Sequence, residues 1–148
     1  MTHLIATLVM ICSALQSAQS HPLIGVWKVT YPWHVDVKDG VVTPVMESGE
    51  MTVEARGDSL IATIVRDNKR AIRLAALKGA ADPTFTTRDS ISFAGANEAK
   101  RNTTVLNTWV FRASGDQLSG SLDRFVENIP MNNPGPQPLS GQRVKARR

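Results

Sequence analysis

The sequence predicts an all-β protein, an antiparallel up-and-down barrel of about eight strands. Short runs with alternating apolar and polar residues indicate strands, and Gly, Asp and Asn between the runs indicate tight turns. After position 20, no long window shows the period of an amphipathic helix. An antiparallel sheet without helices to cover it must close on itself or pack against a second sheet. We therefore expect a barrel, and an open β-sandwich is the alternative.

The first 20 residues form a candidate signal peptide and stand outside the predicted fold. Their apolar run, 4–15, is shorter than the roughly 20 residues that a membrane-spanning helix needs. Ala18 and Ser20 place small residues where a signal peptidase expects them for a cut before His21. We therefore expect one mature domain, 21–148, in the periplasm or outside the cell, without a transmembrane segment.

The composition favours burial as the main source of stability and argues against a nucleic-acid partner. The one cysteine, Cys12, leaves with the leader, so no disulfide supports the predicted domain. The chain has 17 Lys and Arg against 13 Asp and Glu, but much of the positive excess lies in its last six residues. Within the chain, the basic residues between Arg66 and Arg73 bracket a turn and resemble a solvated hairpin tip. A nucleic-acid surface would instead combine a basic stripe with stacking aromatic residues.

The strand segments follow in order from Leu23. The first, 23–31, places Leu23, Trp27, Val29 and Tyr31 on one face. The others are expected at 51–56, 60–65, 72–76, 90–94, 104–113, 118–123 and 139–146. The connections 78–89 and 127–138 are expected to be irregular, because the first is polar and the second holds four prolines.

Two segments, "ARGDSLIAT" from Ala55 and "ASGDQLSGS" from Ala113, share the pattern Ala-x-Gly-Asp-x-Leu at an offset of 58 residues. Glycine supplies the positive φ that tight hairpin turns require. The pattern therefore predicts one hairpin used twice. Arg56-Gly57-Asp58 as an adhesion motif is the weaker interpretation, because the second copy has Ser114 in place of the arginine.

Gly25-Val26-Trp27 on the first strand and Arg143 on the last resemble the signature of the calycin superfamily, which includes lipocalins, fatty-acid-binding proteins and avidins. In that superfamily a basic residue of the last strand lies across the indole and closes one barrel end. More closely, "LIGVWKVT", the two Gly-Asp hairpins and "PLSGQRV" resemble the small lipocalin-like domains of exported bacterial proteins. The resemblance implies structural roles for Gly25, Trp27 and Arg143. The chain lacks the C-terminal helix and disulfide of large lipocalins, whose usual role is small-molecule transport.

The candidate ligand-binding residues are Tyr31, Trp33, Asn107 and Trp109. Asn107 lies on the apolar face of its strand, and a buried amide without a partner costs roughly 1–3 kcal/mol. It is therefore either bonded to the backbone or offered to a ligand. Tyr31 and Trp33 are expected to flank the barrel mouth, where amphipathic rings suit a half-wet rim. Ordinary packing is the alternative for all three aromatic residues.

The expected function is that of an exported, non-enzymatic binding module for a small apolar or amphipathic molecule. Small inward residues, Ala62, Ala76 and Gly120, are expected to leave space at one end of a barrel that can hold one small ligand. The competing class is a structural or protein-docking domain of the envelope with a filled barrel. We expect a monomer, and we find no set of acid, base and nucleophile for catalysis.

Copper binding is a remote further alternative. Cleavage before His21 would create an N-terminal histidine that can chelate Cu(II) with its amine and imidazole, and His34 would add a third nitrogen. The predicted strand separates the two histidines, and Pro22 removes the next peptide nitrogen as a ligand. We expect no other metal and no cofactor.

Overall fold

The computed structural model describes residues 21–39, 41–67, 70–80, 82–93, 101–127 and 135–145, and these parts of the chain contain strands and no helix. The predicted signal peptide, 1–20, lies outside the described residues. The strands are β1 (Gly25–Lys38), β2 (Val41–Arg56), β3 (Ser59–Arg66), β4 (Ala71–Leu77), β5 (Thr84–Phe93), β6 (Arg101–Ser114), β7 (Gln117–Val126) and β8 (Gln137–Arg143).

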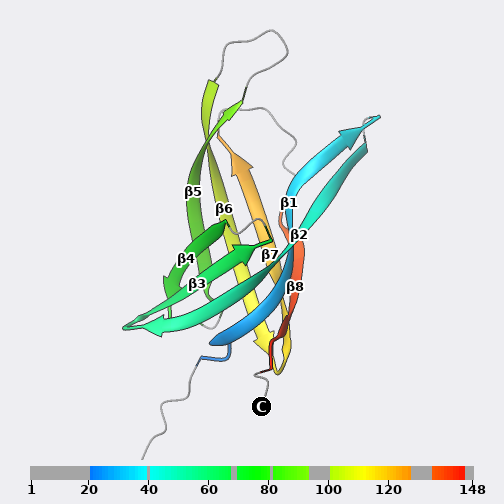
Figure 1. Ribbon diagram of the computed structural model, residues 1–148. Coiled ribbons are helices and arrows are strands. Elements are labelled where there is room, and N and C mark those ends of the chain that lie inside the picture. Colours follow the sequence, from blue (N-terminus) through cyan, green and yellow to red (C-terminus); the bar gives the residue numbers. More distant parts are fainter. Residues whose placement is uncertain are drawn as a thin grey trace, which may run out of the picture.

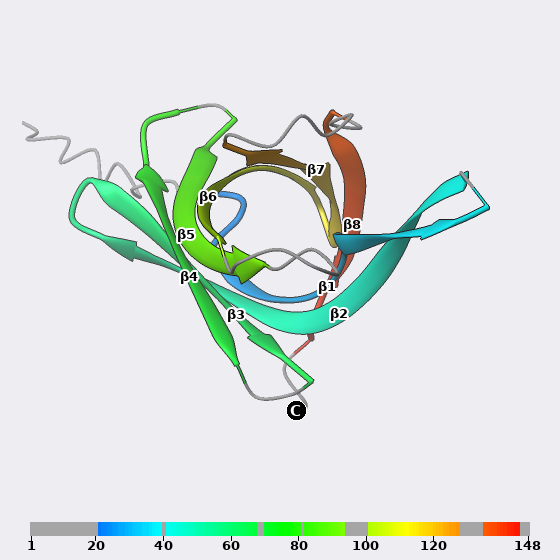
Figure 2. The same ribbon diagram turned by 90° about the horizontal axis from the view of Figure 1, so that it is seen from above.

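All eight strands belong to one antiparallel sheet, with the order β4-β3-β2-β1-β8-β7-β6-β5. The sheet consists of two four-stranded meanders, β1–β4 and β5–β8, which are joined where β1 pairs with β8. It curls until β4 and β5 lie side by side without a hydrogen-bonded ladder between them (Figures 1 and 2). The protein is therefore a nearly closed β-barrel, which confirms the predicted fold class.

The core lies inside this ring and follows the period of two that the sequence shows. Leu23, Trp27, Val29 and Tyr31 are all buried, as expected from their alternation along the first strand. The other strands each add inward residues, among them Met51, Val53, Leu60, Ala62, Ile64, Leu74, Phe85, Trp109, Phe111, Leu118, Leu122 and Leu139. Because successive side chains point to opposite faces, each strand supplies both a core face and a solvent face.

The two Gly-Asp segments form the β2–β3 and β6–β7 hairpins, as predicted. Gly57 and Gly115 are the first central residues of two-residue turns, and both have a φ of 59°. This is the geometry of a hairpin turn that selects glycine at its first position. In each turn the aspartate carbonyl accepts a backbone hydrogen bond, Asp58 from Lys78 at 2.8 Å and Asp116 from Arg143 at 2.9 Å.

Several strand limits differ from the prediction. β5 begins at Thr84, so much of the expected connection 78–89 is strand, and β8 covers 137–143 in place of 139–146. The reason at β5 is its ladder with β6, which satisfies the backbone of a polar segment in which Phe85 is buried. The sequence signal was weak there, because threonines alternate with few apolar residues.

The β1–β2 hairpin is also longer than predicted, because β1 continues to Lys38 and β2 begins at Val41. β8 pairs with β1 only between Trp27 and Thr30, and β3 pairs with β2 only from Gly49 onward. Beyond these positions β1 and β2 pair with each other alone, and the outer part of this hairpin projects as a two-stranded arm away from the ring in both views (Figures 1 and 2).

Candidate functional site

Charged, amide and aromatic side chains gather at the end of the barrel away from Trp27, between the core and the solvent. We call this set the polar cluster: Tyr31, Trp33, Glu47, Arg66, Asp89, Asn107, Trp109 and Arg124. Local geometry places them there, since each continues the inward face of its strand. Arg66 follows Ile64 on β3, and Arg124 follows Leu122 on β7 and lies opposite Asn107 in the register with β6.

The structure brings together the four residues that the sequence suggested as ligand-binding. The Tyr31 ring lies edge-on to the Trp109 ring at 5.2 Å between centroids and to the Trp33 ring at 6.1 Å. Asn107 is the inward neighbour of Trp109 on β6. Tyr31, Asn107 and Trp109 are buried, whereas Trp33 is half-buried. The cluster therefore reaches from the core to the solvent boundary.

Two arginines stack on the indole of Trp33. The Cζ atom of Arg66 lies 4.4 Å from the ring centroid, and that of Arg124 lies 4.5 Å from it. Arg66 is also paired with Glu47, with 2.7 Å between Nη2 and Oε2. Burial lowers the pKa of Arg124, the Asp89 carboxylate opposes this shift, and the positive charge of Arg66 adds to it. Arg66 and Arg124 thus contact the same indole ring, and Arg66 also forms an ion pair with a carboxylate.

Asn107 is held by two side chains of the neighbouring strand, and no backbone partner is found among the described residues. Its Nδ2 donates to Asp89 Oδ2 at 2.8 Å and to Thr87 Oγ1 at 3.2 Å. These contacts follow from the β5–β6 register, which places Thr87 opposite Asn107. The other half of the amide, Oδ1, is buried and has no hydrogen-bond partner in the described part of the protein.

Other buried polar atoms of the cluster share this property. Tyr31 Oη, Trp109 Nε1 and Arg66 Nε lack a hydrogen-bond partner among the described residues. Burial raises the pKa of Tyr31 to about 12, and Arg66 opposes that shift. Tyr31 is therefore a neutral phenol that keeps its proton as a hydrogen-bond donor at any physiological pH.

The sequence interpretation missed the charged members of the cluster. Arg66 was assigned to a solvated hairpin tip, and Glu47, Asp89 and Arg124 were not singled out. The sequence did contain a signal. Leu60, Ala62 and Ile64 show that every second residue of this strand points inward, and Arg66 is the next residue in that series. An arginine at an inward position near the end of a strand indicates a polar group inside the barrel.

The interior near the core is filled by side chains. The Trp109 and Phe111 rings stack at 6.0 Å, and Phe85 packs edge-on against Phe111 at 5.4 Å. Gly120 leaves no space, contrary to expectation, because a Cβ atom there would lie 1.8 Å from the carbonyl oxygen of Val110. Its small size permits close approach of two strands.

Two hollows on the described surface lie outside the ring. One lies beside the β2–β3 turn and the end of β4, and the other on the outer face of β2, β3 and β4. Their linings are Asp58, Leu77, Lys78, Gly79 and Ala80 for the first, and Thr52, Glu54, Arg56, Ile61, Thr63 and Arg73 for the second. Neither touches Asn107 or Trp109, the residues that an internal ligand cavity was expected to reach.

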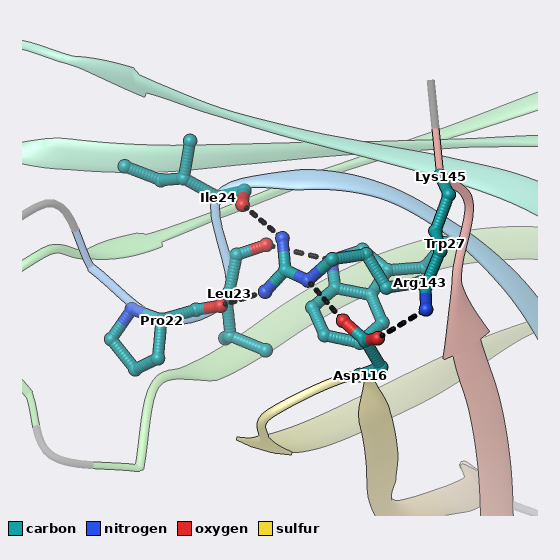
Figure 3. Close-up of polar contacts among 7 residues, drawn as sticks. All are labelled: Pro22, Leu23, Ile24, Trp27, Asp116, Arg143 and Lys145. Carbon is teal, nitrogen blue, oxygen red and sulfur yellow. Dashed lines mark hydrogen bonds and ion pairs between the residues drawn. The ribbon is translucent and has the colours of Figure 1, made fainter. Parts of the chain in front are cut away.

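The opposite end of the barrel is closed by Arg143 (Figure 3). Its Cζ lies 4.1 Å from the centroid of the Trp27 ring, and its Nη1 and Nη2 donate to the carbonyls of Ile24 and Pro22 at 2.8 and 2.7 Å. Trp27 Nε1 donates to the Leu23 carbonyl at 2.8 Å. Gly25 has a φ of 135°, and a Cβ atom there would lie 2.6 Å from Arg143 Nη1.

The two histidines of the copper alternative are separated along the chain by the first part of β1. His21 precedes β1, where its Nδ1 accepts a hydrogen bond from the Leu23 amide at 3.2 Å, whereas His34 belongs to the projecting arm. The structure does not bring them together. Within the described ranges, no three His, Cys, Asp or Glu side chains are grouped as metal ligands.

Comparisons with known proteins add no relative: no family model, no curated protein and no solved structure matches the chain. Among the described residues, no helix has the length and apolar character needed to cross a membrane.

Proposed function

We propose that this protein is a non-enzymatic binding module that takes a small amphipathic molecule at the polar cluster. The observation that carries the proposal is a set of buried polar atoms that have no hydrogen-bond partner among the described residues: Tyr31 Oη, Asn107 Oδ1 and Trp109 Nε1. Leaving such a group unpaired costs roughly 1–3 kcal/mol. A ligand that supplies the missing partners recovers this free energy on binding.

The packing of the core limits where this molecule lies. Phe111 packs against Trp109 and Phe85 and fills the ring below the cluster, whereas Trp33 is half-buried and Asp89 is exposed at its outer side. We therefore place the polar head of the ligand against Tyr31 and Asn107, and its apolar part toward the open side. This differs from a ligand enclosed in a deep cavity.

We further propose that the module acts in the periplasm or outside the cell and is a lipocalin-like member of the calycin superfamily. The support for export is the leader pattern of residues 1–20, and the support for the superfamily is Gly25, Trp27 and Arg143 with their mutual contacts. The mass of the mature protein in an extracytoplasmic fraction should begin at His21. A mature chain that keeps the leader would contradict export.

The binding proposal is tested by titrating the protein with short-chain amphipathic probes while tryptophan fluorescence is recorded. Trp33 and Trp109 lie in the cluster, so we expect a saturable change in emission. Asn107→Leu removes both polar atoms of the amide and should weaken binding about tenfold. Thr108→Val, at the outward neighbouring position of β6, is the matched control and should leave the affinity unchanged. A wild-type protein that binds no probe would contradict the proposal.

A second candidate function, docking to an envelope protein, is favoured by the β1–β2 arm. An isolated two-stranded hairpin is only marginally stable in water, and this arm exposes 63% of Val41 and 47% of Met46. If the arm is a docking surface, Val41→Glu combined with Met46→Glu should abolish a specific crosslink in intact cells and leave probe binding unchanged. A crosslink that survives both changes would contradict docking through the arm.

A further inference from the structure

The charges around Trp33 indicate which head group the ligand carries. Arg66 has Glu47 as its ion-pair partner at 2.7 Å. Arg124 stacks on the same ring, but in the described part of the chain it takes part in no ion pair. The nearby Asp89 carboxylate accepts a hydrogen bond from Asn107 Nδ2 at 2.8 Å. Asp89 acts on Arg124 from beyond ion-pair distance and opposes the lowering of its pKa, but burial outweighs this effect. A half-buried guanidinium that makes no ion pair is stabilised by an anion that comes within hydrogen-bond distance.

The unpartnered hydrogen-bonding groups point to the same chemistry. Trp109 Nε1 and Arg66 Nε can only donate, and the neutral phenol of Tyr31 has a proton to donate. Among the described residues, Asn107 Oδ1 is a buried acceptor without a partner, and an oxyanion that carries no proton leaves it unpaired. A group that matches an excess of donors must present several acceptor oxygens.

We propose that the polar cluster binds the oxyanion head group of an amphipathic molecule, with Arg124 as the counter-charge and with Tyr31 and Trp109 as hydrogen-bond donors. The planar fork of a guanidinium fits carboxylate, sulfate and phosphate oxygens, which share this chemistry. Stacking on Trp33 fixes the plane of the fork before the ligand arrives and lowers the entropy lost on binding. The inference rests on the proposed binding function and adds the charge of the ligand.

The test compares probes that share one alkyl chain and differ in the head group: decanoate, decyl sulfate, decyl phosphate and decan-1-ol. Isothermal titration should give at least one anion an affinity roughly tenfold or more above that of the alcohol, because a charge-assisted hydrogen bond exceeds a neutral one by about that factor. The ranking among the three anions identifies which head group fits.

Variants of the arginine assign the effect to the site. Arg124→Met should reduce the affinity for the preferred anion to that for the alcohol, and Arg124→Lys, which keeps the charge without the fork, should restore part of it. Arg112→Met is the control, because Arg112 is exposed and pairs with Asp82 on the outer surface at 3.0 Å. Circular dichroism of each variant verifies that the barrel has formed.

The possible failures are distinguishable. If the alcohol binds as tightly as the anions, or if Arg124→Met leaves anion affinity unchanged, the oxyanion proposal is overturned and the binding function stands. If no probe binds the wild-type protein, both proposals fail. If Arg124→Met and Arg112→Met weaken anion binding equally, the attraction is a general effect of net charge and the assigned site is wrong.

Discussion

The two ends of the barrel interior use the same contact, a guanidinium stacked on an indole, and differ in what surrounds it. At the closed end, Arg143 on Trp27 also donates to two backbone carbonyls and lies 3.7 Å from an Asp116 oxygen. In the polar cluster, Arg124 on Trp33 has no such partners among the described residues, and buried donors beside it are unpaired.

This difference separates a structural contact from a binding site. A buried polar group that is fully satisfied stabilises the fold and offers nothing to a ligand. A group that is left unpaired costs stability in the free protein and gains most when a ligand supplies the partner. Stacking of an arginine on a tryptophan is therefore not diagnostic of either role; the hydrogen-bond partners around the pair decide.

The largest expected effect comes from breaking the closed end. Arg143→Met removes the cation, both carbonyl hydrogen bonds and the contact with Asp116, so we expect the free energy of unfolding to fall by about 2–4 kcal/mol. Arg124→Met is the matched change in the polar cluster and should cost less than about 1 kcal/mol, because it removes a cation without an ion pair. Urea denaturation of both variants measures the difference. Equal losses would contradict the distinction between the two ends.

The next effect uses the ionisation of Tyr31, the one tyrosine of the chain. Burial raises its pKa from 10.0 to about 12, so the unfolded chain loses the phenolic proton at lower pH than the folded protein. The stabilisation from a protonated Tyr31 is complete below pH 10 and is lost between pH 10 and 12, by roughly 2–3 kcal/mol.

The measurement is the urea midpoint of the wild type and of Tyr31→Phe across this pH range, with phenolate absorbance as a direct record of ionisation. The variant should lack the tyrosine contribution but keep the effects of lysines, which titrate in both proteins. If the urea midpoints of the two proteins change with pH in the same way, burial does not raise the pKa of Tyr31, which would contradict the prediction.

The smallest effect compares the two Gly-Asp hairpins. Asp116 lies 3.3 Å from Lys145 Nζ and 3.7 Å from Arg143 Nε, whereas Asp58 takes part in no ion pair within the described ranges. Asp116→Asn should cost about 0.5 kcal/mol, because the pairs are exposed, and Asp58→Asn should cost almost nothing. High salt should remove the difference between the variants. A difference that persists in high salt would exclude a screened ion pair as its cause.

The sequence by itself determined the fold class, the inward faces and the turns. A period of two assigns each residue of a strand to one of two faces without knowledge of the partner strand, and Gly57 and Gly115 mark turns by local backbone geometry alone. Strand ends were less certain, because the limits of β5 depend on its ladder with β6 and not on its own polar residues.

Only the tertiary structure decided what the charged residues do. The alternation along each strand is enough to place Arg66 and Arg124 on inward faces. That both contact Trp33, however, depends on the curvature that brings β3 and β7 across the barrel from each other. Whether a buried donor finds an acceptor likewise depends on atoms far away in the sequence. A site made of unpaired groups is therefore set by long-range packing, whereas the strands that carry it are set by local alternation.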